Sequence, residues 1–178
     1  MRKLSENKAL FPSLGFSHRQ LVEIAYRWVL KRASCGVALK ELTTINSETP
    51  DVIGFGSWGH SVLVEVKISR TDFLSDKNKF FRKYPEQGMG TQRFYCCPRG
   101  IIKKEDLPKG WGLIYVNEKG KAVCVHQPYK GNIGERVEGL EKNIQAEHCL
   151  MYSALRRLHL RGRIDEIYEN AENYNQWE

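Results

Sequence analysis

The chain has 178 residues, of which 41% are hydrophobic and 28% are charged, and its formal net charge is +7. This length and balance fit one α/β domain with a real core, and no apolar run approaches the roughly 18 residues that a membrane span needs. The five cysteines form no CxxC pair, which argues against a disulfide framework or a structural zinc site and favours reduced thiols. The sequence therefore predicts a cytoplasmic protein with no membrane partner.

The excess of positive charge lies in residues 1–110, whereas residues 111–178 carry slightly more acidic than basic side chains. Contacts to phosphates come mainly from Lys and Arg, so this distribution favours a polyanionic partner. We expect DNA, with RNA not excluded. A generally basic surface that serves solubility would show the same bias, so charge alone leaves both interpretations open.

The first half of the chain predicts one helix followed by three strands. Residues 1–16 read as an N-terminal arm. Ser17 can cap a helix that runs to about residue 32, because apolar residues recur in it at helical spacing. Strands are predicted over residues 37–44, 51–55 and 61–68, and the last two form a hairpin. The third strand is dominated by β-branched residues and carries charge only at its end.

The second half adds a helix from Thr71, as N-cap, to about residue 84. A glycine-rich loop then leads to a strand over residues 93–97, and a hairpin is predicted from residues 111–117 and 122–126. Residues 135–160 and 163–169 have helical patterns, and the tail is expected to fray. The order predicts an α/β fold with a mixed sheet: helix, three strands, helix, strand, then an added hairpin and C-terminal helices.

Three residues of the first hairpin form a candidate catalytic site. Asp51 begins one strand, and Glu65 and Lys67 are two residues apart on the next, so both point to one face. Carboxylates suit Mg²⁺, with Mn²⁺ as a substitute, and the ion would activate an attacking water. Lys67 would orient that water or stabilise charge on the phosphorane. Taken singly, the three residues also fit a turn or an edge strand.

The same residues resemble a known signature. Pro50-Asp51 followed by Glu65-Val66-Lys67 is similar to the PD-(D/E)XK motif of restriction-endonuclease-like nucleases, whose core has the same order of elements. Residues 65–76 are similar to the EVK-x-S-R-x-DF-L-x-D stretch of the MmcB-like branch of DNA-repair nucleases. The resemblance covers roughly residues 17–126. It implies a restriction-endonuclease-like core and a metal-dependent nuclease that hydrolyses phosphodiester bonds in DNA, in repair, recombination or processing.

The resemblance also suggests an organisation and further ligands. We expect a nuclease-like domain over residues 17–130 and an accessory helical region over residues 131–178. Glu41 is either a further metal ligand, as in several such families, or an exposed strand residue. His18 lies near the apolar stripe of the first helix and Glu23 points away from it, so His18 is the preferred ligand there. The predicted metal ligands are therefore Asp51, Glu65, Glu41 and His18, and the number of ions stays open.

Basic side chains that follow the motif are candidates for contact with nucleic acid: Arg70, Lys77, Lys79, Arg82 and Lys83. The plainer alternatives are that Arg70 pairs with Asp72 or Asp76 and that the others form a solvated helix face. Two rival functions remain for the whole chain. One is a nucleic-acid-binding module with a degenerate nuclease site, and the other is a phage-type interaction or inhibitor protein.

Overall fold

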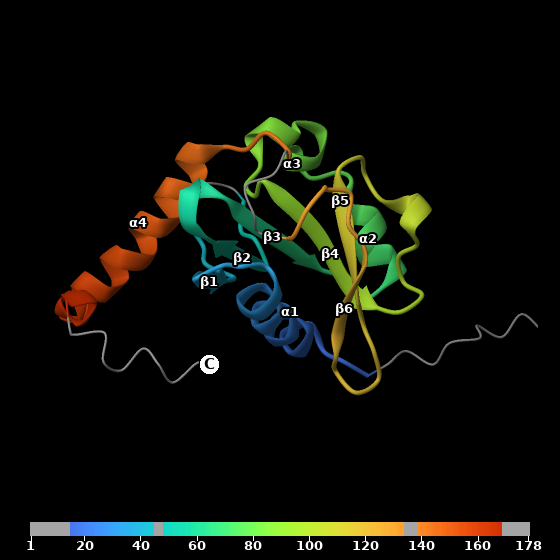
Figure 1. Cartoon of the computed structure of the whole chain (residues 1–178), viewed down its shortest axis with the longest axis horizontal. Coiled ribbons are helices and arrows are strands. Elements are labelled where there is room, and N and C mark those ends of the chain that lie inside the picture. Colours follow the sequence, from blue (N-terminus) through green and yellow to red (C-terminus); the bar gives the residue numbers. More distant parts are fainter. Residues whose placement is uncertain (1–14, 45–47, 134–138, 169–178) are drawn as a thin grey trace, which may run out of the picture.

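A six-stranded mixed sheet forms the centre of the protein (Figure 1). The computed structural model describes residues 15–44, 48–133 and 139–168. Strands β3 and β4 and strands β4 and β5 pair in parallel, and the other neighbours are antiparallel. The sheet order follows the chain: β1 Val37–Lys40, β2 Val52–Phe55, β3 Ser61–Val66, β4 Gln92–Pro98, β5 Trp111–Val116 and β6 Ala122–His126. The predicted α/β class with a mixed sheet is confirmed.

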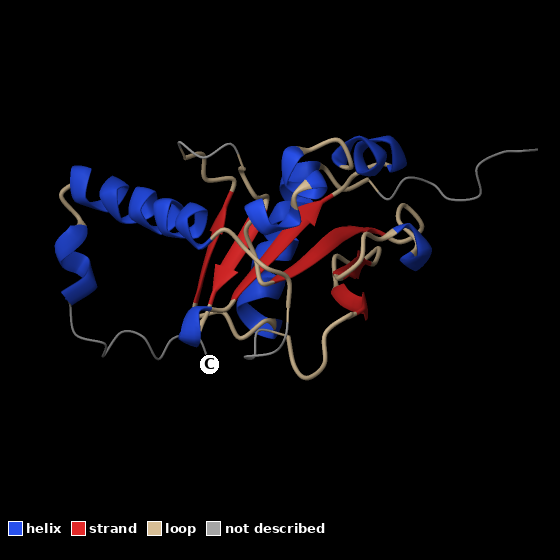
Figure 2. Cartoon of the chain, turned by 90° about the horizontal axis from the view of Figure 1, so that it is seen from above, coloured by secondary structure: helices blue, strands red, loops and turns tan. Residues whose placement is uncertain are grey.

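The described residues also form four α-helices: α1 His18–Arg32, α2 Arg70–Asp76, α3 Phe80–Lys83 and α4 Ile144–Leu160. Short 3-10 turns occur at Ser57–Gly59, Pro85–Gln87, Lys104–Asp106 and Ile164–Tyr168. Helix α1 lies on one side of the sheet, and α4 extends away from the body of the protein (Figures 1 and 2). Within the described ranges, no helix is both long and apolar enough to cross a bilayer. All five cysteines are free thiols.

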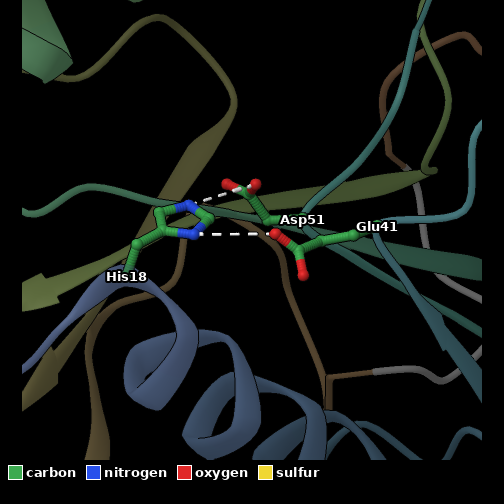
Figure 3. A group of neighbouring side chains, drawn as sticks. All are labelled: His18, Glu41 and Asp51. Carbon is green, nitrogen blue, oxygen red and sulfur yellow. Dashed lines mark ion pairs between the residues drawn. The ribbon is translucent and has the colours of Figure 1, made fainter.

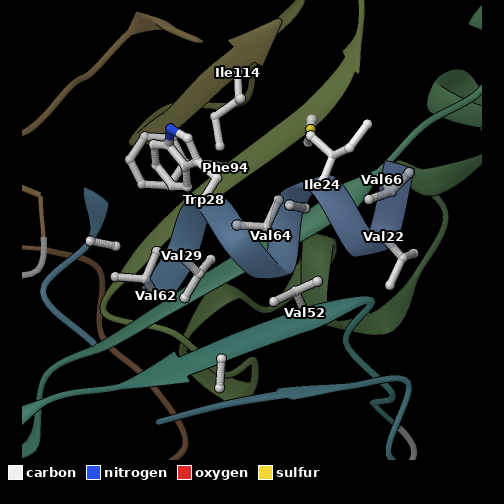
Figure 4. Close-up of a cluster of buried hydrophobic side chains, with 14 of the residues drawn as sticks. Val22, Ile24, Trp28, Val29, Val52, Val62, Val64, Val66, Phe94 and Ile114 are labelled. Carbon is white, nitrogen blue, oxygen red and sulfur yellow. The ribbon is translucent and has the colours of Figure 1, made fainter. Parts of the chain in front are cut away.

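Alternating side chains of the strands build a hydrophobic core on each face of the sheet. Val52, Val64 and Val66 face α1, where they pack with Ile24 and Trp28 (Figure 4). On the other face, the buried set includes residues from three strands, from α2 and from α4: Ile53, Leu63, Tyr95, Phe73 and Leu150. Because both faces of β3 are covered, all six of its residues are buried. The strand that carries Glu65 is therefore a central one.

Two features set the start of α1 and its position on the sheet. At its start, Ser17 Oγ accepts the N–H of Gln20 at 3.3 Å, and Gln20 Oε1 accepts the N–H of Ser17 at 2.8 Å, which is a capping box. Along its length, α1 packs closely on β2 at Gly54. A Cβ atom at Gly54 would lie 2.3 Å from Val29 Cγ1. These contacts set where His18, the first residue of α1, lies relative to the strand hairpin.

Several predicted boundaries need correction. Strand β1 ends at Lys40 rather than near residue 44, because Glu41 has φ of 48° and leaves the strand. The predicted helix over residues 71–84 is two helices, and its first cap is Ser69, whose hydroxyl accepts the N–H of Asp72 at 3.1 Å. Helix α4 begins at Ile144, capped by Asn143, and not near residue 135. The predicted arm up to residue 14 and the tail from residue 169 lie outside the described residues.

Candidate metal centre and its ion-pair network

Three side chains from separate elements meet at the start of β2 (Figure 3). His18 opens α1, Glu41 follows β1, and Asp51 precedes β2. His18 Nε2 lies 3.3 Å from Asp51 Oδ1, and His18 Nδ1 lies 3.6 Å from Glu41 Oε1. One ligand atom from each residue lies within 4.8 Å of the other two. The structure thus brings together three of the four predicted metal ligands in an arrangement that one divalent ion would fit.

Asp51 is held by a backbone hydrogen bond and has a raised pKa. Its Oδ2 accepts the backbone N–H of Val66 at 2.7 Å, which ties the carboxylate to β3 between Glu65 and Lys67. Burial raises the pKa of Asp51 to about 6, and the charge of Glu65 acts in the same direction. The Val66 N–H and His18 oppose the shift without cancelling it. A carboxylate held near a second carboxylate in this way would be stabilised by a cation.

Glu65 lies close enough to influence Asp51 but belongs to a different cluster. Its side chain is only 2% exposed, and its Oε2 lies 3.4 Å from Lys67 Nζ, 3.0 Å from Lys79 Nζ and 3.4 Å from the Arg82 guanidinium. Among the described residues, it is not part of the group formed by His18, Glu41 and Asp51. The structure therefore groups only three of the four predicted ligands. The carboxylate of Glu65 is paired with lysine and arginine side chains instead.

Asp76 is a second buried carboxylate in this network, and the sequence interpretation considered it only as a possible surface partner of Arg70. Lys67 Nζ lies 3.1 Å from its Oδ1, Arg82 Nε lies 2.7 Å from its Oδ2, and Tyr95 donates its hydroxyl at 2.6 Å. Burial would raise the pKa of Asp76, but Arg82, Tyr95 and Lys67 together hold it well below its ordinary value. The signal was its spacing, because Asp76 is three residues after Phe73 on the buried face of α2.

The predicted nucleic-acid contacts have different surroundings. Arg82 has a side chain only 5% exposed, and its guanidinium lies 4.5 Å from the centroid of the Trp111 ring. It cannot reach a phosphate in this conformation, so the prediction that it binds nucleic acid is corrected to a structural role. The cause is the break between α2 and α3, which turns Arg82 inward towards the buried acids.

The other four candidates remain at least partly exposed. Arg70 pairs with Asp106 (2.6 Å from NH2 to Oδ1), which is neither of the two acids considered as its partner. Lys79 is half-exposed and pairs with Glu65 and Asp76. Lys77 and Lys83 are exposed. Two of these four cations are therefore already engaged with carboxylates.

The architecture defines an α/β protein with a six-stranded mixed sheet, and comparison supports this class. The structure is similar to one described as "SPO1766 protein of unknown function from Silicibacter pomeroyi", with a TM-score of 0.55 and 19% sequence identity. The alignment covers 96% of this chain and 100% of that one. No protein-family model and no curated protein matches the chain. At this level of identity, the likeness concerns the fold alone.

Proposed function

We propose that this protein is a divalent-metal-dependent nuclease of the restriction-endonuclease-like type that hydrolyses phosphodiester bonds in DNA. The observation that carries the proposal is the group formed by His18, Glu41 and Asp51, which adjoins Glu65 of β3 and Lys67 just after that strand. A site that pairs metal ligands with a fixed cation suits the cleavage of a phosphodiester. The sequence resemblance to the PD-(D/E)XK motif supports the same assignment.

The residues fit the metal that the proposal requires. His18, Glu41 and Asp51 would hold Mg²⁺ or Mn²⁺. Burial and the charge of Glu65 raise the pKa of Asp51, so a cation at this position would stabilise its ionised carboxylate. When bound, the ion supplies Lewis-acid activation of a water and of the phosphate. His18 is oriented by the capped start of α1, and Asp51 is oriented by the Val66 N–H. Both ligands are therefore positioned before any ion binds, which favours tight coordination.

The chain's own charges prepare the site for an anionic substrate. Lys67 is buried and held between Glu65 and Asp76, so its ammonium group has a fixed position from which it would orient a water or stabilise charge on the phosphate. Lys79 is half-exposed on the same carboxylates. A phosphate that approaches the site would compete for Lys79 and would loosen its hold on Glu65.

The decisive experiment is a cleavage assay with Mg²⁺ or Mn²⁺ on single-stranded, duplex and branched DNA and on RNA, with EDTA as the control. We expect Glu65→Gln and Lys67→Ala each to lower the rate on the order of 10²–10³, as for other single electrostatic contributors. The exposed Lys109→Ala is the matched control and should cleave at the wild-type rate, because Lys109 belongs to none of the predicted contacts. Thermal melts check that the variants fold, and Lys67→Met keeps the packing if Lys67→Ala does not. Unchanged rates in both site variants would remove Glu65 and Lys67 from catalysis.

One observation favours a second candidate, a nucleic-acid-binding module with a degenerate nuclease site. Glu65 is held by Lys67, Lys79 and Arg82 rather than grouped with Asp51. If that arrangement persists with DNA and metal present, the ligand set stays incomplete. The same assay separates the candidates, because a binding module would bind DNA without cleaving it in any metal.

A further inference from the structure

We propose that the groove between α1 and the turn of the β5–β6 hairpin binds the sugar–phosphate backbone of the nucleic acid. The inference rests on the proposed function and names a surface that the sequence did not suggest. In Figure 1 the hairpin turn lies beside α1, and the Ile24 Cδ1 atom of α1 lies 3.7 Å from the position that a Cβ would take at Gly120. Segments almost a hundred residues apart in the chain thus form the two walls.

The groove has a volume of about 780 Å³ and a strongly basic lining. Phe16, Ile24 and Trp28 supply apolar surface, and Glu23 is the one acidic residue among the described residues that line the groove. The cations that line it are Arg19, Arg27, Lys31, Arg32, Lys119 and Lys121. Six positive charges around one open groove create a potential that attracts a polyanion and, with apolar surface between them, suit a backbone of phosphates and sugars.

These six cations are available, unlike those near Glu65. All six residues are exposed, and within the described ranges no carboxylate lies at ion-pair distance from any of them. Glu23 is itself paired with Lys40. By contrast, Arg70, Lys79 and Arg82 are engaged with acids. Phosphate binding gains most from cations that need not first give up a protein partner.

The groove and the candidate metal centre both use residues of the first turn of α1. His18 contributes to the metal centre, and the next two residues, Arg19 and Gln20, line the groove. The 15 residues of α1 span about 22 Å at 1.5 Å per residue. At the roughly 3.4 Å rise per nucleotide of a duplex strand, that length corresponds to about six nucleotides. A backbone that follows α1 would therefore pass the metal centre at the start of this helix.

The test is a binding measurement by fluorescence anisotropy on short single-stranded and duplex DNA in EDTA, so that nothing is cleaved. Two charge-removing pairs address the two walls: Lys119→Gln with Lys121→Gln, and Lys31→Gln with Arg32→Gln. Lys104→Gln with Lys109→Gln is the control, since both lysines are exposed and lie outside the groove. Each groove pair should weaken binding at least about tenfold and lower the slope of log K against log salt by about 1–2, at roughly 0.7–0.9 per contact. The control pair should change both quantities much less.

Equal losses in the groove and control variants would overturn the inference, as would a wild-type protein that does not bind DNA. Polyglutamate or anionic vesicles that compete as well as DNA, with the same dependence on the groove lysines, would assign the groove to another partner and also overturn it. Cleavage is measured in parallel with Mg²⁺ and Mn²⁺. If the protein binds DNA through the groove but does not cleave it, only the proposed nuclease function is contradicted. If it cleaves DNA and the groove variants cleave at the wild-type rate, only the proposal about the groove is contradicted.

Discussion

Asp51 links the two charged clusters of the site. Its Oδ1 faces His18 in the candidate metal centre, while its Oδ2 accepts the N–H of Val66, between Glu65 and Lys67. The charge of Glu65 contributes to its raised pKa, although the Glu65 carboxylate is paired elsewhere. Changes at Asp51 should therefore report on metal binding and on the ion-pair network together.

The raised pKa of Asp51 predicts how stability depends on pH. The folded protein binds a proton at Asp51 more tightly than the unfolded chain does, because the pKa rises from 3.8 to about 6. The stability from this residue is therefore present below about pH 4 and is lost as the pH rises through about 6. At about 1.4 kcal/mol per pKa unit, the loss is at most about 3 kcal/mol. We expect metal-free Asp51→Asn to melt above the wild type at pH 7.5, with a smaller difference at pH 4.5. A wild type that is the more stable at both values would contradict this account.

Metal binding gives a second prediction at the same residue. Mn²⁺ or Mg²⁺ should raise the melting temperature of the wild type more at pH 7.5 than at pH 5, because Asp51 must lose its proton to coordinate. Asp51→Asn and Glu41→Gln should lose this increase, and the exposed Glu105→Gln should keep it. If Glu65→Gln loses the increase while Glu41→Gln keeps it, the ion binds between Asp51 and Glu65 instead.

The spacing of residues along the chain predicted part of this site. The ion pairs around Glu65 became visible only in the folded structure. The period of a strand placed Glu65 and Lys67 on one face, and a helical projection favoured His18 over Glu23. The structure brings His18 to Asp51, while Glu23 pairs with Lys40. Lys67 was expected beside Glu65, but the other two cations that pair with Glu65, Lys79 and Arg82, could not be predicted in this way. They lie in the turn after α2 and in α3, and the sequence pattern does not specify the direction of that turn.

At the scale of elements, the break between α2 and α3 is the main departure from the sequence pattern. Residues 70–84 contain no proline or glycine, so the pattern predicted one continuous helix. In the structure the chain turns at residues 77–79, and Lys79 and Arg82 reach Asp76 at 2.9 and 2.7 Å. Buried ion pairs therefore outweigh the helical propensity of this segment, which is worth only a few tenths of a kcal/mol per residue.

This arrangement predicts that Arg82 matters for folding more than for binding. Arg82→Met would leave Asp76 buried without its closest cation and would remove a neighbour of Glu48 and Glu65. Removing one partner from a buried pair costs about 3–5 kcal/mol, whereas the exposed neighbour Lys83→Met should stay within about 0.5 kcal/mol of the wild type. Urea unfolding of the three proteins measures both values. A large loss of DNA binding with unchanged stability in Arg82→Met would restore its predicted role at the nucleic-acid surface.

At the scale of the whole molecule, the sequence showed where the excess of positive charge lies. It did not show which lysines and arginines lack a carboxylate partner and can bind a phosphate. Residues 61–110 hold many lysines and arginines, yet Lys67, Lys79 and Arg82 neutralise buried acids there. Six cations with no carboxylate at ion-pair distance among the described residues line the groove between α1 and the β5–β6 turn. The sequence could not predict this surface, because it depends on how two distant segments lie across one sheet. The basic character of a region is thus a weaker guide to binding than the pairing of its charges.

The sequence predicted that residues 131–178 form an accessory region, but only the later part of helix α4 lies outside the core. Its first turns belong to the core, where Leu150 is buried and Glu147 Oε1 accepts from Ser61 Oγ at 2.6 Å and from the Gly90 N–H at 2.8 Å. Its later turns extend away from the sheet (Figure 2). Arg157 donates an exposed hydrogen bond to the Thr43 carbonyl. A chain that ends after Ser153 should therefore unfold within about 1 kcal/mol of the full-length protein, since among the described residues the removed part gives up about one hydrogen bond to the rest of the protein. Leu150→Ala should lower the free energy of unfolding by about 2–5 kcal/mol through the cavity that it creates. Urea unfolding compares the two, and a shortened chain as unstable as Leu150→Ala would mean that the whole of α4 supports the sheet.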